Sequence, residues 1–105
     1  MESKSSFAQK LSRLRARLKD PEWRRYGALL LTGKVNGING RPYAYGFEDG
    51  RKDGGGAVGH GGGAPGMNGD LRIYPTSGYV VAVLSNLDPP AATQVSAFLD
   101  VRLPR

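Results

Sequence analysis

The stretch DLRIYPTSGYVVAVLSN, residues 70–86, decides the fold that the sequence predicts. Leu71 and Ile73 alternate with polar residues, which is typical of a strand with one buried face. The segment PTSG, residues 75–78, indicates a turn, and residues 79–86 form a continuous apolar run rich in valine. Such a run predicts a strand that is buried on both faces and therefore central in its sheet.

Two segments before residue 70 predict the remaining strands. In RPYAYGFE, residues 41–48, Tyr43, Tyr45 and Phe47 alternate with smaller or polar residues, which indicates a half-buried strand. A further short strand is expected over residues 57–61. NGING, residues 36–40, and GGAPGMNG, residues 62–69, predict turns. The sequence thus predicts an antiparallel sheet of about four strands.

Helices are expected on both sides of these strands along the chain. Ser5 or Ser6 can cap a first helix, Asp20 a second, and Asp88 a third whose first turn contains prolines. The residues expected to be buried are Phe7, Leu11, Leu14 and Leu18 in the first helix, Trp23, Tyr26, Leu30 and Leu31 in the second, and Ala92, Val95, Phe98, Leu99 and Leu103 in the third.

The predicted fold class is α+β, with N-terminal helices and one C-terminal helix packed on the antiparallel sheet. Residues 1–40 are expected to form a basic helical segment and residues 41–105 the meander and last helix, in one compact domain. Eight Lys or Arg and three Asp or Glu lie in residues 1–25, which therefore carry five of the six net positive charges. A solvated helix face is the preferred interpretation, and polyanion binding by the first helix is a weaker alternative.

Several function classes are excluded by composition. The chain has no cysteine and a single histidine, His60, so neither a disulfide nor a metal site is expected. Residues 54–59 and 61–66 both match G-x-G-x-x-G, but a strand and not a helix is expected to follow them, and Pro65 lies inside the second match, so no nucleotide cofactor is expected. Without a signal peptide or a long apolar run, the chain is expected to be soluble and cytoplasmic as given, with no membrane and no nucleic acid as partner.

An ordered set of motifs runs from residue 60 to residue 103: HGG, GAPGMNG, DLRIYP, TSG, YVVAVLSN and DPPAATQVSAFLDVRL. Together with YAYGFE ahead of it, this set resembles the C-terminal portion of the class C β-lactamase-like serine hydrolases, which include β-lactamases, D-amino acid peptidases and esterases. The likeness is sharp over residues 41–103 and softer over residues 5–35.

The resemblance implies a role for each residue of the HGGG segment. His60 stands where the family has the Lys or His of its third motif, which helps to protonate the leaving group or holds the substrate carboxylate. Gly61 and Gly62 complete that motif and bind substrate. The N–H group of Gly63 corresponds to the position that gives half of the oxyanion hole, which stabilises developing negative charge.

The nucleophile of that family is missing from this sequence. None of the seven serines is followed three residues later by lysine, so there is no Ser-x-x-Lys, and Tyr-x-Asn and Ser-x-Asn are absent too. The hypothesis is therefore a C-terminal fragment of a hydrolase of amide or ester substrates that is inactive alone, either a truncated piece of a longer chain or a subunit completed by a companion N-terminal chain. The alternative is a non-catalytic module that binds a peptide, a partner chain or a second copy through the exposed edge of residues 79–86.

Overall fold

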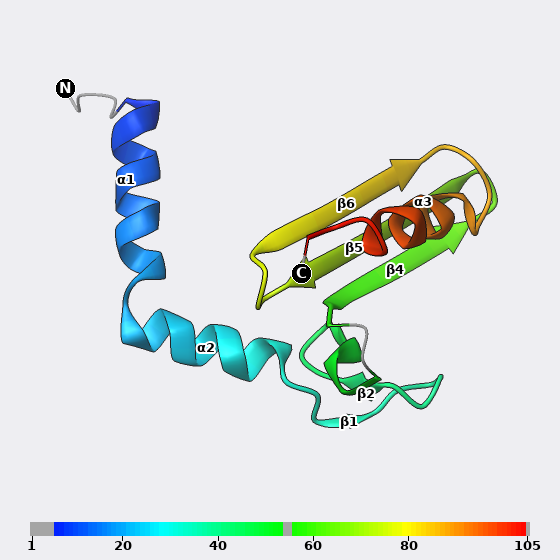
Figure 1. The fold of residues 1–105 in the computed structure, drawn as a ribbon, viewed down its shortest axis with the longest axis horizontal. Coiled ribbons are helices and arrows are strands. Elements are labelled where there is room, and N and C mark those ends of the chain that lie inside the picture. The colour runs from blue at the N-terminus through cyan, green and yellow to red at the C-terminus, as the bar shows by residue number, and fades with distance from the viewer. Residues whose placement is uncertain (1–5, 54–55, 105) are drawn as a thin grey trace. The chain divides into compact units, whose positions relative to one another are not determined.

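The computed structural model describes residues 6–53 and 56–104, which fall into two compact units, residues 1–30 and residues 31–105. Helix α1, Phe7–Leu18, and nearly all of helix α2, Pro21–Leu31, belong to the first unit. The second unit contains a six-stranded antiparallel sheet and helix α3, Ala91–Asp100 (Figure 1). The predicted α+β class is confirmed, with two more strands than expected.

The two N-terminal helices begin where the sequence predicts. Ser6 Oγ accepts from the Gln9 N–H at 3.2 Å and Gln9 Oε1 accepts from the Ser6 N–H at 2.9 Å, a capping box at the start of α1. Asp20 Oδ1 accepts from the Glu22 N–H at 2.9 Å at the start of α2. Both caps are local, because each joins residues two or three positions apart.

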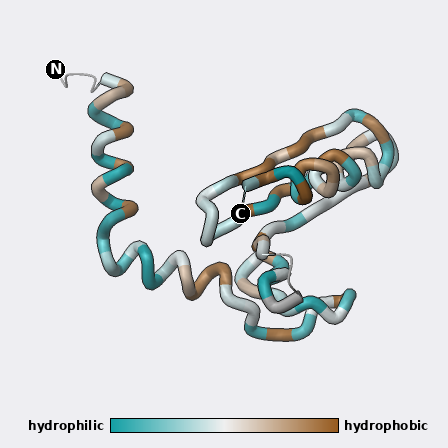
Figure 2. Tube along the Cα trace, in the orientation of Figure 1, coloured by the Kyte–Doolittle hydropathy of each residue, from teal (hydrophilic) through white to brown (hydrophobic). Residues whose placement is uncertain are grey.

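The prediction of buried faces on these helices is wrong, because neither helix contains a buried residue. The side chains of Phe7, Trp23 and Tyr26 are 81, 51 and 52% exposed. Figure 2 shows the apolar positions of α1 recurring along the helix between polar ones. Regular apolar spacing predicts the helix correctly but does not by itself supply a surface that covers the apolar stripe.

Three two-residue strands open the sheet: β1, Val35–Asn36, β2, Pro42–Tyr43, and β3, Glu48–Asp49. The turn predicted at residues 36–40 joins β1 to β2. The single strand predicted over residues 41–48 is wrong, because Gly46 takes a φ of 83° and the Ala44 N–H donates to the Phe47 carbonyl at 2.7 Å. The alternation of Tyr and Phe imitates a strand, but the positive φ of Gly46 reverses the chain.

The longer strands are β4, Val58–Ala64, β5, Met67–Tyr74, and β6, Tyr79–Ser85. They match the three strands predicted near residues 57–61, 70–75 and 79–86, and β4 and β5 continue further than predicted toward the turn between them. The turn predicted over residues 62–69 shortens to Pro65 and Gly66, whose φ of 77° matches the third position of a type II turn. Gly62, Gly63, Asn68 and Gly69 are therefore strand residues.

Strand β6 lies at the edge of the sheet, so the prediction that it is central is wrong. The strand order runs β1-β2-β3-β4-β5-β6, and β6 pairs with β5. Val81 is 8% exposed, whereas Val80 and Leu84 on the opposite face are 62 and 90% exposed. Helix α3 covers one face only (Figure 1), and an apolar run does not distinguish one covered face from two.

The N-terminus of helix α3 is capped by a side chain of strand β5. Asn68 Oδ1 in β5 accepts from the N–H groups of Ala92 and Thr93 at 2.7 and 3.4 Å. The predicted cap, Asp88, instead accepts from the Gly66 N–H at the β4–β5 turn. Asn68 itself is only 7% exposed, so its amide ties the start of α3 to the covered face of the sheet.

The prediction for the buried face of α3 is right for Ala92, Leu99 and Leu103, which are buried or half-buried, and wrong for Val95 and Phe98. Ala92 and Ser96 are fully buried, whereas Val95 and Phe98 are 48 and 56% exposed. Ala92 and Ser96, four residues apart, lie on the same side of α3, and the Ala92 N–H is the one that donates to Asn68 in β5. The hydroxyl of Ser96 is buried and, within the described residues, has no hydrogen-bond partner.

Candidate functional site

The four residues of the HGGG segment, His60 to Gly63, follow one another in β4. Strand β3 pairs with β4 only opposite Val58 and Gly59. From His60 to Ala64, the side of β4 that faces away from β5 therefore has no ladder partner among the residues that the structure describes. We call this stretch the β4 edge.

The β4–β5 hairpin fixes which backbone groups face the β4 edge. Ala64 and Met67 flank the two-residue turn and form its first hydrogen-bonded pair, and such pairs then alternate along an antiparallel ladder. Gly63 and Gly61 therefore belong to non-hydrogen-bonded pairs, and their N–H and C=O groups point away from β5. The same alternation holds at Ala57, whose carbonyl accepts from the Gly50 N–H at 3.0 Å on that side.

His60 lies on the surface of β4, where its two ring nitrogens have different partners. Nδ1 lies 2.6 Å from the Gly61 carbonyl oxygen and Nε2 lies 3.0 Å from the Tyr43 hydroxyl. Since a carbonyl only accepts, Nδ1 carries the proton in the neutral ring, and Nε2 accepts from the Tyr43 O–H. The Tyr43 ring also packs edge-on against His60, with centroids 5.8 Å apart.

The three glycines of the segment meet different surroundings. A Cβ atom at Gly63 would overlap the ring of Pro89, and at Gly62 it would meet nothing within 4 Å. At Gly61 it would lie 3.2 Å from Asp70 Oδ1. Close packing therefore requires glycine at residue 63, the Asp70 carboxylate leaves little room for a side chain at residue 61, and residue 62 alone of the three leaves space beside the strand.

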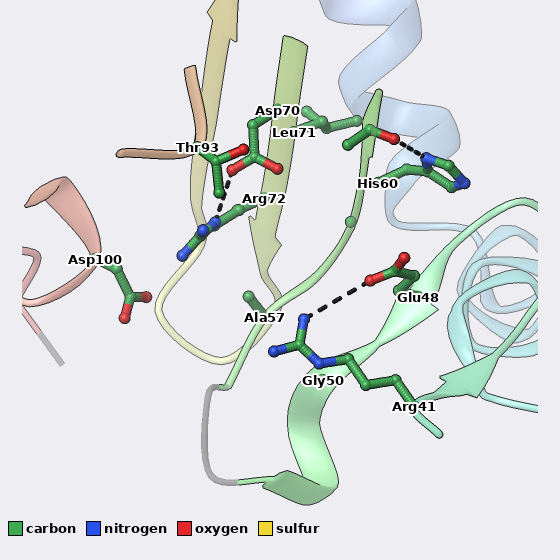
Figure 3. A pocket seen from close by; sticks show the side chains of 12 residues that line it. Arg41, Glu48, Gly50, Ala57, His60, Asp70, Leu71, Arg72, Thr93 and Asp100 are labelled. Atoms are coloured by element: carbon green, nitrogen blue, oxygen red, sulfur yellow. Dashed lines mark hydrogen bonds and ion pairs between the residues drawn. The ribbon is translucent and has the colours of Figure 1, made fainter. Parts of the chain in front are cut away.

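A cavity of about 370 Å³ adjoins the β4 edge. Figure 3 shows Arg72 and Asp100 at one side of this cavity and the Arg41–Glu48 ion pair, 3.7 Å long, at the other. The other lining residues are Gly50, Ala57, Gly59, His60, Gly61, Asp70, Leu71 and Thr93. No serine lines the cavity among the described residues, so the arrangement offers a binding surface and a histidine but no hydroxyl nucleophile of the Ser type.

One polar contact within β5 and one from β5 to α3 lie beside this cavity. Arg72 Nε donates to Asp70 Oδ2 at 2.9 Å, and the Tyr74 O–H donates to Asp100 Oδ1. Burial, together with the Asp100 carboxylate, raises the pKa of the Tyr74 hydroxyl above its usual value. These contacts hold the side chains of β5 and α3 in place behind the glycines of β4.

A second ion pair supports β3, which borders the site. Asp49 is 2% exposed, and its carboxylate accepts from Arg51 Nε and Nη2 at 2.8 and 2.9 Å and from the Gly33 N–H at 3.0 Å. The hydrogen bonds from the Arg51 guanidinium hold the pKa of the Asp49 carboxyl well below its usual range. Asp49 therefore joins β3 to the chain that follows α2.

The structure brings the predicted residues His60, Gly61, Gly62 and Gly63 together and adds residues that the sequence did not indicate. Tyr43 was assigned to the strand pattern of residues 41–48, and no sequence signal marked it as a partner of His60. Asp70 and Thr93 could not be connected to the segment either, because strand pairing and the packing of α3 bring them there.

The described residues contain no cluster of three or more side chains suited to hold a metal ion. None of the helices in the described part of the chain combines the length and the apolarity needed to cross a bilayer. Comparison of the chain with protein-family models, with curated proteins and with solved structures finds no match.

Proposed function

We propose that the β4 edge binds an extended amide or ester substrate and forms one wall of a serine-hydrolase-type site. The single observation that supports this most strongly is the orientation of the Gly61 and Gly63 N–H groups, which face away from β5 where β3 no longer pairs. Two backbone donors on an open strand edge suit an extended substrate, and the Gly63 N–H is suited to an oxyanion. This agrees with the role that the resemblance implies for Gly63.

His60 is the proposed acid–base group of this wall. Its Nε2 atom lies 3.0 Å from the Tyr43 hydroxyl, so the pair offers a chain of two groups that can pass a proton to a leaving group. His60 is exposed, which keeps it accessible to a substrate along the β4 edge.

The nucleophile of the proposed site comes from outside these 105 residues, since no Ser-x-x-Lys occurs in them. Acyl transfer needs a group that attacks the carbonyl, and half an oxyanion hole does not replace it. The chain by itself is therefore expected to bind but not to turn over its substrate.

Amide NMR shifts on the isotope-labelled chain test the binding step. On titration with N-acetyl-tetraalanine amide, the Gly61 and Gly63 amides should shift, while the Gly62 amide, which faces β5, should shift much less. Equal shifts at all three glycines, or none, would contradict the proposal. A burst of acylation with a p-nitrophenyl ester or a chromogenic β-lactam, abolished by replacing one serine, would contradict the missing nucleophile.

A second candidate function is association through the outer edge of β6, with a second copy of the chain as the partner. Residues 79–85 contain no charged residue and no proline, so nothing in β6 opposes pairing with another β6 strand. Light scattering over a tenfold concentration range tests this, with Ala82→Lys as the variant that charges the exposed centre of the strand. A monomer at all concentrations would exclude the second candidate.

A further inference from the structure

The covered face of the sheet contains a position without a side chain, Gly61, in line with an aspartate. Gly61 pairs directly with Asp70 of β5, and residues opposite each other in an antiparallel pair project to the same face. A Cβ atom on Gly61 would lie 3.2 Å from Asp70 Oδ1, so the Asp70 carboxylate extends toward the space that Gly61 leaves.

Gly61 and Asp70 form a row that crosses the two strands on one face of the sheet. A ligand strand paired with the β4 edge would add one residue to this row. The ligand residue that pairs with Gly61 would project to the same face as Gly61 and Asp70, and it would lie about 9–10 Å from the β5 backbone, two strand spacings away. Gly61 places no side chain between the two. At Gly63 the equivalent space is taken by Pro89, so the row is open only at Gly61.

The charge of the open row is negative. The Asp70 side chain is 11% exposed, and its Oδ2 accepts from Arg72 while Oδ1 is the oxygen nearest to Gly61. The charged side chains that line the adjoining cavity among the described residues are three carboxylates, Glu48, Asp70 and Asp100, and two guanidinium groups, Arg41 and Arg72. The cavity beside Gly61 is thus lined by one more negatively charged than positively charged side chain.

We propose that the ligand residue paired with Gly61 carries a cationic side chain, a lysine or an arginine, which crosses Gly61 and meets Asp70. This inference rests on the proposed function, because it names the substrate class of the same edge. A long flexible cationic stem can span the empty position and place its charge at the carboxylate. A glutamate there would face the Asp70 carboxylate, and an apolar side chain would cover Asp70 without replacing the water that it loses.

Three peptides that differ at one residue test the inference: N-acetyl-Ala-Ala-Xaa-Ala-Ala amides with Xaa as lysine, norleucine or glutamate. Affinities come from the Gly61 amide shift of the whole chain. We expect the lysine peptide to bind about threefold to tenfold more tightly than the norleucine peptide and the glutamate peptide to bind most weakly. The lysine preference should shrink when the salt concentration rises from 0.05 to 0.5 M, in the unaltered protein.

Two matched variants test whether Asp70, and not another carboxylate of the cavity, is the group that the cationic side chain meets. Asp70→Asn should reduce the ratio of lysine to norleucine affinity to less than twofold. Glu48→Gln removes the same charge from the cavity, but Glu48 pairs with Gly59 rather than Gly61, so most of the lysine preference should remain. Each variant is first compared with the unaltered protein by its amide spectrum.

The outcomes separate the inference from the function on which it rests. Equal affinities for the lysine and norleucine peptides, or a full lysine preference in a folded Asp70→Asn, would overturn the inference and leave the proposed function standing. If Asp70→Asn does not fold, a lysine preference that salt does not weaken overturns it. Absence of any Gly61 shift with all three peptides would overturn both.

Discussion

Replacing the neighbouring glycines 62 and 63 by alanine gives a direct test of the packing that positions the candidate site. At Gly63 the new methyl group would overlap Pro89, which leads into α3, whereas at Gly62 it would enter open space. Neither glycine has a positive φ, so alanine is not excluded by backbone conformation at either position. At Gly63 the new methyl group would also lie 3.1 Å from Asn68 Nδ2 and 3.3 Å from the Met67 carbonyl oxygen, but the overlap with Pro89 is the closest of the three contacts.

The expected magnitudes follow from two terms. Both substitutions reduce the conformational freedom of the unfolded chain, which stabilises each variant by about 0.4–1 kcal/mol. Gly63→Ala also forces one carbon atom into a filled space, which typically costs about 1–3 kcal/mol. Because the first term cancels, Gly63→Ala should be less stable than Gly62→Ala by about 1–3 kcal/mol, or roughly 4–20 °C in Tm for a unit of 75 residues.

The assay must report on the sheet and not on the N-terminal helices. The single tryptophan, Trp23, lies in α2, so its fluorescence is unsuitable. Near-ultraviolet circular dichroism of the tyrosines follows the sheet more directly, because Tyr74 is 6% exposed beneath α3. Urea titrations would then give the free energy of unfolding of each variant.

A second pair of variants distinguishes the Pro89 contact from other effects at Gly63. Pro89→Ala removes the ring that the new methyl would overlap, so the cost of Gly63→Ala should fall by at least half in that background. The reasoning is refuted if Gly62→Ala and Gly63→Ala agree to within about 0.5 kcal/mol, or if Pro89→Ala leaves their difference unchanged.

Four further predictions concern side chains that hold the sheet unit together. Asn68→Ala should destabilise it by about 1–3 kcal/mol in urea unfolding, since it removes the cap of α3 and leaves buried N–H groups without an acceptor. Ser96→Ala should leave the free energy of unfolding unchanged or raise it, because the lost hydroxyl is buried without a partner; a loss above about 1 kcal/mol would reveal a bond. Since the pKa of Asp49 is lowered in the folded state, its ion pair with Arg51 stabilises fully above the ordinary carboxyl pKa and less as pH falls below about 4; unfolding measured from pH 6 to pH 2 should show this slope, and Asp49→Asn should reduce it. Val81→Lys should cost several kcal/mol by chemical denaturation, because Val81 is buried under α3; an unchanged midpoint would contradict that burial.

Local signals predicted local structure well. The Ser6 cap and the turn at Gly78, which has a φ of 80° and donates its N–H to the Tyr74 carbonyl at 2.8 Å, join residues a few positions apart. The cap of α3 could not be found in this way, because Asn68 lies 24 residues before the Ala92 N–H that it accepts from. For α3 the burial of Ala92 was predicted correctly, but the exposure of Val95 and Phe98 was not, because it depends on which side of the helix meets the sheet.

The candidate site shows the same limit. The glycines and His60 are adjacent in the sequence, so their common place in β4 could be predicted from the chain alone. The hydroxyl that hydrogen-bonds His60 belongs to Tyr43, 17 residues earlier, and it reaches the ring because two unforeseen hairpin strands fold back on one another. The position of β6 at the sheet edge was missed because apolar side chains show that a strand can be buried, whereas the packing of the rest of the chain decides whether one face or both are buried.

The two-residue turn at Pro65 and Gly66 determines which residues of β4 direct their N–H groups to the open edge and which direct them to β5. Moving back from Ala64, every second residue gives its N–H group to the open edge, and the residues between give theirs to β5. Inserting or deleting one residue between Gly61 and the turn would interchange these roles. His60 would then project beneath α3 and its backbone groups would face the edge, so the site depends on the number of residues before the turn as much as on their identity.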